Sequence, residues 1–338
     1  NTTAIWTVEG NQGGAKMGYS LAGVGDVNGD GYSDVIVGAL NYDNGHTDEG
    51  AAFVYHGSAT GISIMAAATV ESDQTNAKMG GSVAGAGDVN GDGYSDVIVG
   101  ALLYDNGSTD EGAAFVYLGS ATGINSSVAT ILDCNQANAE MGRSVSGAGD
   151  VNGDGYGDVI VGAYNYDNVE TNEGAAFVYY GSAIGVGTTA AATVESNQAN
   201  ALMGVSVATA GDVNGDGFSD VIVGAWSYDS GLADEGAAFV YHGSATGINT
   251  IATSIVESNQ ASAYMGFSVA GAGDVNGDGY SDVIVGAVGY DGGQTDEGAA
   301  FVYHGTTTGI NTIAAAIVES NQVNVQMGLS VASAGDVN

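Results

Sequence analysis

The sequence is poor in basic residues. Its 338 residues include only three Lys or Arg against 39 Asp or Glu, which gives a formal net charge of −36. A nucleic-acid-binding protein needs a basic surface to displace counterions from phosphates, and three basic side chains cannot form one. A polybasic membrane-surface segment is excluded for the same reason. The acidic excess is therefore the feature that the function has to explain.

Long apolar runs and cysteine pairs are also missing. The longest weakly polar stretch, residues 61–70, is too short for a helix that crosses a bilayer, so no membrane span is expected. The single cysteine, Cys134, cannot form an internal disulfide. With 44% hydrophobic residues the chain is nevertheless too apolar for a disordered acidic tail, and we expect it to fold.

One unit repeats along the whole sequence. The string GDVNGDG recurs in steps of 62 residues, with its first Asp at 26, 88, 150, 212 and 274, and a truncated copy begins at Asp336. Self-similarity at a fixed period indicates a repeat architecture rather than unrelated domains. Residues 1–338 are therefore expected to form a single repeat domain or a fragment of a longer array.

Each copy contains four short runs of β-forming residues. In the second copy these are residues 81–87, 96–102, 112–119 and 129–135, separated by Gly, Asn and Asp. Four short strands per repeat are typical of a propeller blade. The fold class predicted is all-β, a β-propeller of four-stranded antiparallel blades, with five complete blades and a partial blade formed by the two ends. A parallel β-helix is the alternative, although its repeats are shorter.

An acidic nine-residue loop joins the first two strands of each copy. In residues 26–34, side-chain oxygens fall at loop positions 1, 3, 5 and 9, and position 7 offers a main-chain carbonyl. This alternation places hard oxygen ligands around one cation and favours calcium over magnesium. The predicted ligands are Asp26, Asn28, Asp30, Tyr32, Asp34; Asp88, Asn90, Asp92, Tyr94, Asp96; Asp150, Asn152, Asp154, Tyr156, Asp158; Asp212, Asn214, Asp216, Phe218, Asp220; and Asp274, Asn276, Asp278, Tyr280, Asp282.

The alternative interpretation is a plain turn without metal, because Asp, Asn and Gly favour turns anyway. Five loops with three carboxylates each favour the metal site, since unneutralised charges so close together repel one another. These loops hold 15 of the 39 acidic residues, and five calcium ions would bring the net charge to about −26. Such sites are typically filled outside the cell, so an extracellular or cell-surface location is expected.

The run GDVNGDGYSDVIVGA resembles the FG-GAP repeat, the unit that forms the propeller of integrin α-subunits, and the resemblance covers the whole chain. It departs from the family in two motifs. Met-Gly replaces Phe-Gly in every copy, beginning with Met17, and Leu40 and its equivalents replace the family's Pro. Met can keep the packing role of Phe. The resemblance implies structural calcium on one side of the propeller and partner binding on the opposite side.

Alternate loops of an antiparallel meander lie at opposite ends of the strands. We call one end the acidic-loop side; it carries the loops between the first and second strands and between the third and fourth. The other end, the linker side, carries the loops between the second and third strands and the linkers to the next copy. All basic residues and several aromatic residues fall there, which indicates a partner-binding surface. The candidates are Lys16, Tyr19, Lys78, Arg143, Tyr164, Trp226, Tyr264 and Phe267. Neutral drift at solvated positions is the alternative.

The function predicted is an extracellular, calcium-stabilised scaffold for adhesion or protein–protein interaction, with no enzymatic activity. The recurring Asp43 and Glu49 are expected to cap loop amides rather than to act as an acid–base pair. Two further hypotheses stay open. Unpaired strands at the chain ends predict self-association into a multimer or filament, and the aromatic residues would suit a calcium-dependent lectin that binds a glycan ligand.

Overall fold

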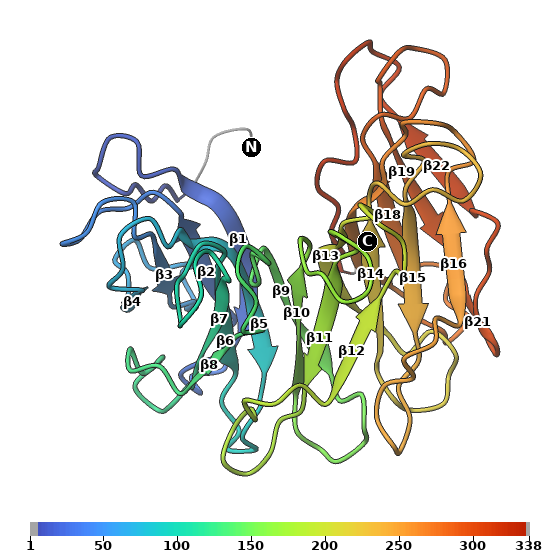
Figure 1. The fold of residues 1–338 in the computed structure, drawn as a ribbon. Helices are drawn as coiled ribbons and strands as arrows, with labels where there is room; N and C mark the ends of the chain where they lie inside the picture. Colours follow the sequence, from blue (N-terminus) through green and yellow to red (C-terminus); the bar gives the residue numbers. More distant parts are fainter. Residues whose placement is uncertain (1–5, 336–338) are drawn as a thin grey trace. The chain divides into compact units, whose positions relative to one another are not determined.

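The structure is a computed structural model that describes residues 6–335 (Figure 1). In that range it contains strands and turns, and none of the described residues is helical. Within the same range no segment could cross a membrane as an apolar helix. The truncated acidic loop at Asp336 lies outside the described residues.

Five sheets of four strands follow one another along the chain, each antiparallel in its recorded pairings. The first contains β1 (Met17–Gly25), β2 (Asp34–Ala39), β3 (Ala51–Tyr55) and β4 (Ala68–Glu71), and the second contains β5 (Met79–Gly87), β6 (Asp96–Ala101), β7 (Ala113–Tyr117) and β8 (Thr130–Leu132). The third contains β9 (Ser144–Gly149), β10 (Asp158–Ala163), β11 (Ala175–Tyr179) and β12 (Ala192–Glu195). The fourth contains β13 (Met203–Gly211), β14 (Asp220–Ala225), β15 (Ala237–Tyr241) and β16 (Ser254–Glu257). The fifth contains β17 (Met265–Gly273), β18 (Asp282–Ala287), β19 (Ala299–Tyr303) and β22 (Ala316–Glu319).

The prediction of an all-β fold of propeller-type blades is confirmed. In every sheet the strands pair in chain order. A short hairpin, β20 (Gly305–Thr306) and β21 (Gly309–Ile310), is added before β22. The described residues at the two ends, 6–16 and 328–335, contain no strand, and the partial blade made by the ends stays a prediction.

The chain divides into two compact units. The first comprises Asn1–Gly147, Tyr156–Val159 and Tyr180–Thr189, and the second comprises Ala148–Gly155, Ile160–Tyr179 and Ala190–Asn338. The division runs through the third sheet, and each unit is described below by itself. The organisation of the whole chain as one propeller stays a prediction.

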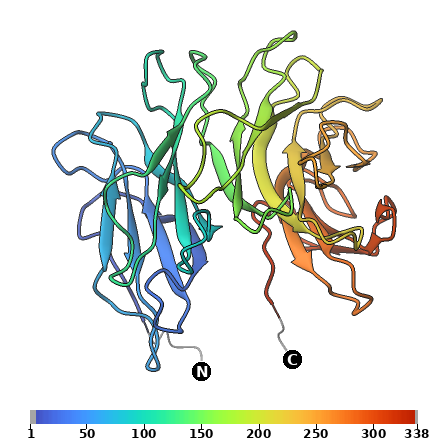
Figure 2. The same ribbon diagram turned by 90° about the horizontal axis from the view of Figure 1, so that it is seen from below.

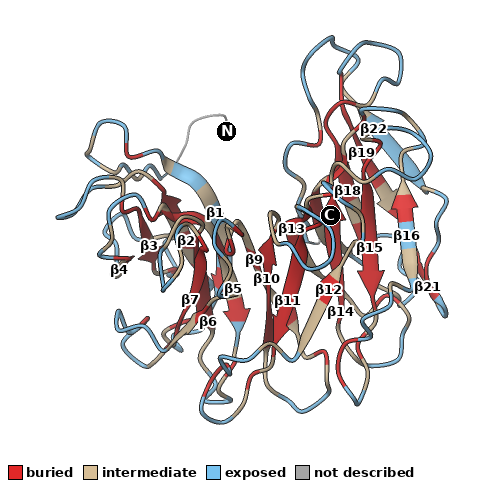
Figure 3. Ribbon diagram, in the orientation of Figure 1, coloured by how far each residue is buried: buried red, intermediate tan, exposed pale blue. Residues whose placement is uncertain are grey.

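The inner strands of the second, third and fourth sheets are buried on both faces. All six residues of β6 and all five of β7 are buried, which explains their continuous apolar sequences DVIVGA and AAFVY. The outermost strands, such as β16, alternate between buried and more exposed positions (Figure 3). The acidic residue that begins β6, Asp96, is buried with them, although a carboxylate is rarely buried without a partner.

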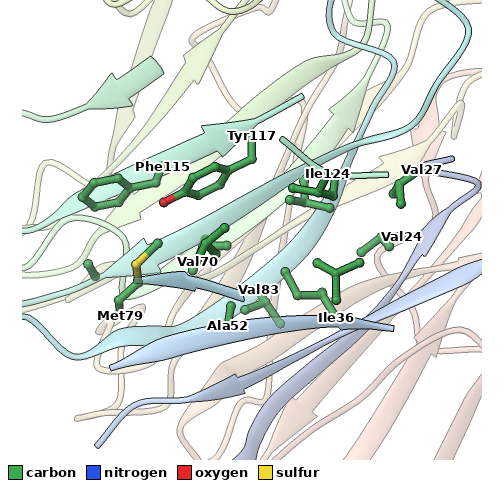
Figure 4. Packing of buried hydrophobic residues seen from close by; sticks show 14 of the residues in the cluster. Val24, Val27, Ile36, Ala52, Val70, Met79, Val83, Phe115, Tyr117 and Ile124 are labelled. Carbon is green, nitrogen blue, oxygen red and sulfur yellow. The ribbon is translucent and has the colours of Figure 1, made fainter. Parts of the chain in front are cut away.

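The core of each unit lies between consecutive sheets. Figure 4 shows the cluster in the first unit, where Ile36 and Val70 of the first sheet meet Val83, Phe115 and Tyr117 of the second. A second cluster of the same kind joins the fourth and fifth sheets. The Met residues expected to replace a packing Phe are fully buried at Met79, Met141, Met203 and Met265. A thioether fills an irregular gap there, as predicted.

Consecutive sheets approach so closely that one strand position requires glycine. A Cβ added to Gly38 in β2 would lie 2.1 Å from the carbonyl oxygen of Gly80 in β5. Gly80 itself has a φ of 77°, which L-amino acids with side chains rarely adopt. The GA at the end of DVIVGA is therefore a requirement of sheet packing.

The predicted separation of loops into two sides is also correct. The acidic loop at Asn90 and Asp92 lines one pocket together with residues 118–120, 122 and 124–126, which join the third and fourth strands. At the other end, Asn76 of a linker donates its N–H to the carbonyl of Thr47, in the loop between β2 and β3. Figure 2 gives a second view of these loops at the two ends of the strands.

Candidate metal-binding loops and the opposite linker side

The first Asp of each acidic loop organises the loop backbone. In the second copy, Asp88 Oδ1 accepts the N–H groups of Gly91 at 2.7 Å and Asp92 at 3.1 Å, and its Oδ2 accepts that of Gly93 at 2.8 Å. The same bonds recur at Asp26, Asp150, Asp212 and Asp274. These hydrogen bonds favour the ionised carboxylate. The pKa of Asp274 is lowered chiefly by the N–H of Gly279, whose effect is larger than the opposing effect of desolvation, and further by the N–H groups of Asp278 and Gly277.

The last Asp of each loop is buried and ties two loops together. Asp96 is fully buried, and it accepts the N–H of Val89 at 2.8 Å and, from the loop between β7 and β8, that of Gly119 at 2.7 Å. The bond to the third-to-fourth loop recurs at Asp34, Asp158, Asp220 and Asp282. Loop position 9 therefore has a structural role that its spacing in the sequence does not reveal.

Burial of this Asp is electrostatically unfavourable when the loop holds no cation. Desolvation raises the pKa of Asp96 to about 6, against the lowering effect of its two N–H donors, and the charges of Asp92 and Asp88 raise it further. The pKa of Asp220 rises to about 7 for the same reasons. A positive charge inside the loop would stabilise the ionised form of each buried carboxylate.

The donor set of each loop fits a hard cation. Three Asp carboxylates, one Asn amide oxygen and a main-chain carbonyl are all oxygen donors, as calcium prefers. Oxygens that accept one N–H, such as Asp92 Oδ1 from Tyr94 at 3.0 Å, keep a second lone pair for a cation. Among described residues, no group of three carboxylates within one of the first, second, fourth or fifth loops has oxygens all within 4.8 Å of one another. Side-chain rotation would therefore accompany ion binding.

Neighbouring acidic loops contact one another inside each unit. Ser95 donates its N–H to the carbonyl of Asp26 at 2.9 Å. The ring of Tyr94 lies over Gly29, where an added Cβ would come within 2.7 Å of Cε1. Tyr280 lies against Gly215 in the same way. The Tyr or Phe predicted to offer a carbonyl thus also fixes its loop to the preceding one through its side chain.

On the linker side, three of the predicted partner-binding residues form an aromatic cluster in the second unit. The ring centroid of Trp226 lies 5.5 Å from that of Tyr264 and 5.3 Å from that of Phe267. All three side chains are of intermediate exposure. Trp226 Nε1 is buried and has no hydrogen-bond partner. Because Trp and Tyr rings that combine an apolar body with one polar end are enriched at interfaces, this half-exposed cluster suits a contact surface.

The predicted basic residues differ in how much they are engaged. Lys78 pairs with Asp48 at 2.8 Å and donates to Asn41 Oδ1 at 3.1 Å, so its ammonium group holds the linker to the loop between β2 and β3. Lys16 is exposed, as is its neighbour Tyr19. Arg143 and Tyr164 are of intermediate exposure. Lys16, Lys78 and Tyr264 share a repeat position with positive φ, near 55°, which directs the chain from linker into strand.

One recurring hydrogen-bonded contact on the linker side is not among the sequence-based predictions. Gln74 Nε2 donates to the carbonyl of Asp105 at 3.0 Å, and Gln74 Oε1 accepts the N–H of Asp105 at 2.7 Å. Gln12, Gln198 and Gln260 make the same paired bonds, each to a residue 31 positions later. The sequence does contain a sign of this contact, because a Gln recurs at the same repeat position in every linker.

The structural interpretation of the recurring acidic pair is supported. Asp43 Oδ1 accepts the N–H of Asp48 at 2.6 Å, and Glu49 Oε1 accepts those of Asn44 and His46.

Cys134 occupies the repeat position that Ser72 holds in the first copy. Ser72 donates to the carbonyl of Glu49 at 3.1 Å, and the Sγ of Cys134 lies 3.9 Å from the carbonyl of Glu111. Burial raises the pKa of the Cys134 thiol to about 11, which keeps it protonated and unreactive.

Consecutive four-stranded antiparallel sheets, each with an acidic nine-residue loop at the same end, define a protein built from β-propeller blades. The family model of the FG-GAP repeat matches residues 17–55, 79–117 and 141–179, and that of the FG-GAP-like repeat matches residues 212–285. The chain belongs to the FG-GAP repeat family and is integrin α-like.

Similar proteins include three integrin α chains. Integrin alpha pat-2 of Caenorhabditis briggsae is 33% identical over 62% of this chain, integrin alpha-6 of Homo sapiens 36% over 41%, and integrin alpha-5 of Xenopus laevis 28% over 54%. The matched regions span 18%, 12% and 18% of those three proteins. This chain thus corresponds to less than a fifth of their length.

Proposed function

We propose that the chain is an extracellular scaffold for adhesion or protein–protein interaction, stabilised by about five calcium ions in its acidic loops. The observation that carries the proposal is a difference between the two sides. The acidic loops keep the same Asp and Asn residues and the same hydrogen bonds from the first Asp in each copy, whereas the linker side changes its side chains from copy to copy. A constant side suits a structural ion, and a variable side on a rigid scaffold suits recognition.

Calcium would stabilise the fold through the contacts between loops. When bound, the ion supplies positive charge to each group of three carboxylates. Asp96 and its equivalents already join the acidic loop to the loop between the third and fourth strands, so neutralising their buried charge strengthens that connection. A ligand that binds only the folded state at ten times its Kd contributes about 1.4 kcal/mol per site.

The partner surface that we propose lies on the linker side. Support comes from the aromatic cluster of Trp226, Tyr264 and Phe267 in the second unit and from the exposed Lys16 and Tyr19 in the first. Trp, Tyr and Arg are the residue types most enriched among those that supply binding energy at protein interfaces. The likeness to integrin α chains supports a scaffold for adhesion rather than an enzyme, and a location outside the cell is part of the same proposal.

The test is a binding assay with immobilised full chain. A panel of purified extracellular-matrix proteins and a glycan array would be applied with calcium and with chelator. We expect calcium-dependent binding of a matrix protein that falls about tenfold or more in Trp226→Ala and Arg143→Ala, as for residues at an interface centre. Ile255→Ala is the control, because Ile255 is exposed on β16, away from both loop sides.

The same assay decides between this proposal and the two other hypotheses. Binding to glycans alone would favour the lectin. Light scattering that shows a multimer in calcium would favour self-association. Matrix binding that is equal in all three variants would overturn the partner surface on the linker side and leave neutral drift as the explanation of its variability.

A further inference from the structure

A second kind of metal-binding group lies on the linker side of the first sheet. His46 and Glu49 belong to the loop between β2 and β3, and Asp73 belongs to the linker after β4. One ligand atom from each lies within 4.8 Å of the other two. Across residues 6–335 this is the one group of three His, Cys, Asp or Glu side chains that meets that condition.

The geometry of the pair inside this group suits direct coordination. His46 Nδ1 lies 3.4 Å from Glu49 Oε2. Two ligands at about 2.0–2.1 Å from one tetrahedral metal ion are separated by about 3.4 Å. The side chains of His46 and Asp73 are exposed, so an ion can enter from solvent and water can complete its coordination.

Glu49 supplies independent support for a ligand at this position. The residue is fully buried, and its Oε1 is occupied by N–H groups of its own loop. Its Oε2 is buried and accepts no hydrogen bond, and the same holds for the equivalent oxygens of Glu111, Glu173 and Glu297. A buried, charged oxygen without such a bond is unfavourable, and in the first copy a His and an Asp lie beside it, so that a cation between Oε2, His46 and Asp73 would satisfy it.

The complete group exists only in the first copy. The buried Glu recurs as Glu111, Glu173, Glu235 and Glu297, but His46 is replaced by Ser108, Glu170, Leu232 and Gln294, and Asp73 by Asn135, Asn197, Asn259 and Asn321. The nearby cation Lys78 is paired with Asp48 and Asn41. The other copies therefore provide natural replacements for each exposed ligand.

We propose that His46, Glu49 and Asp73 form a binding site for a divalent transition-metal ion, with zinc as the probe. Imidazole nitrogen and carboxylate oxygen are donor types that zinc binds, whereas calcium takes oxygen ligands only. The site does not depend on the function proposed for the acidic loops. A bound ion would link the loop between β2 and β3 to the linker that leads into β5.

The test is a zinc titration of the full chain with calcium in excess, so that the acidic loops are occupied. The four histidine rings, His46, His56, His242 and His304, are followed by NMR. We expect one equivalent of zinc to shift the His46 signals while the other three stay in place. A tenfold rise in calcium should not reproduce the shift.

Two variants exchange a ligand for the residue that other copies carry. Asp73→Asn and His46→Ser should each weaken zinc binding about tenfold or more, since changes even to supporting residues of metal sites cost 10–100-fold. Asn tolerates the φ of 55° at position 73, so the first variant should fold normally. Asp110→Asn is the matched control: it removes one charge at a positive-φ linker-side position where the third copy already has Asn172.

Zinc binding that is as tight in Asp73→Asn as in the unmodified chain would overturn the site. So would an equal loss in Asp110→Asn, because bulk negative charge would then explain the binding. A calcium-induced shift of His46 would overturn the assignment to a transition metal.

Discussion

The acidic-loop side and the linker side of each sheet both consist of two connecting segments, yet they are held together differently. On the acidic-loop side the connections run through carboxylates, such as Asp96 between Val89 and Gly119. On the linker side they run through a neutral amide, such as Gln74 on the main chain of Asp105, and through an ion pair between Lys78 and Asp48. Buried carboxylates hold the first side, and we propose that a cation stabilises them, whereas Gln74 and its equivalents on the second side bind the main chain without any ion.

This difference explains where the sequence can vary. At the acidic-loop side the side chains themselves hold the structure, so each copy needs the same Asp residues. At the linker side much of the connection between segments is made by the backbone and by the recurring Gln side chains. Side chains such as Lys16, Lys78 and Tyr264 project from equivalent positive-φ positions and are free to differ. The recognition residues that we propose therefore lie on the side where the side chains differ most between copies.

The largest loss of stability is expected from Asp96→Ala, which we compare with Asp92→Ala in the same loop. Asp96→Ala leaves the buried N–H groups of Val89 and Gly119 without an acceptor, at about 1–3 kcal/mol each. It should lower the free energy of unfolding by about 3 kcal/mol or more even in chelator. Asp92→Ala, at an exposed position, should cost less than about 1 kcal/mol in chelator and act mainly in calcium.

Urea denaturation of both variants, with calcium and with chelator, measures this contrast. Equal losses in chelator would show that Asp96 acts only as a metal ligand and that its hydrogen bonds contribute little.

A smaller effect is expected from the neutral contact on the linker side. Gln74→Ala removes two hydrogen bonds to Asp105, each worth about 0.5–1.5 kcal/mol, from an exposed position. It should lower the free energy of unfolding by about 1 kcal/mol, by the same amount in calcium and in chelator. Thr75→Ala, at the exposed neighbouring position, is the control. A loss of unfolding free energy that differs between calcium and chelator would contradict the distinction between the two sides.

The smallest effect is expected at Cys134. Cys134→Ser should restore the bond that Ser72, Ser196 and Ser258 make to the carbonyl of the preceding Glu. One neutral hydrogen bond is worth about 0.5–1.5 kcal/mol, so a gain of about 0.5 kcal/mol is expected. Cys134→Ala should show no gain. Differential scanning calorimetry of the two variants checks this, and a loss in the Ser variant would contradict the shared role.

Much of the fold could be predicted because one unit is repeated. Strand order, the two loop sides and the burial of Met79 follow from alternation and periodicity. Asp34 illustrates the limit. Its spacing identifies an oxygen ligand, but its bond to Gly57, 23 residues away, depends on how the loops meet in space. Contacts between separate loops set the same limit, as for Trp226 with Tyr264 and His46 with Asp73. No local sequence pattern predicts that these residues meet.

The central claim is that the acidic-loop side is held together by calcium, and thermal unfolding across calcium concentrations tests it most directly. The melting temperature of the full chain would be measured in chelator and from 10⁻⁴ to 10⁻² M calcium, at concentrations chosen around typical extracellular sites. Magnesium at matched ionic strength is the control. The account predicts a melting temperature that rises with the logarithm of calcium concentration and falls in chelator. A melting temperature that is the same in calcium, magnesium and chelator would contradict it.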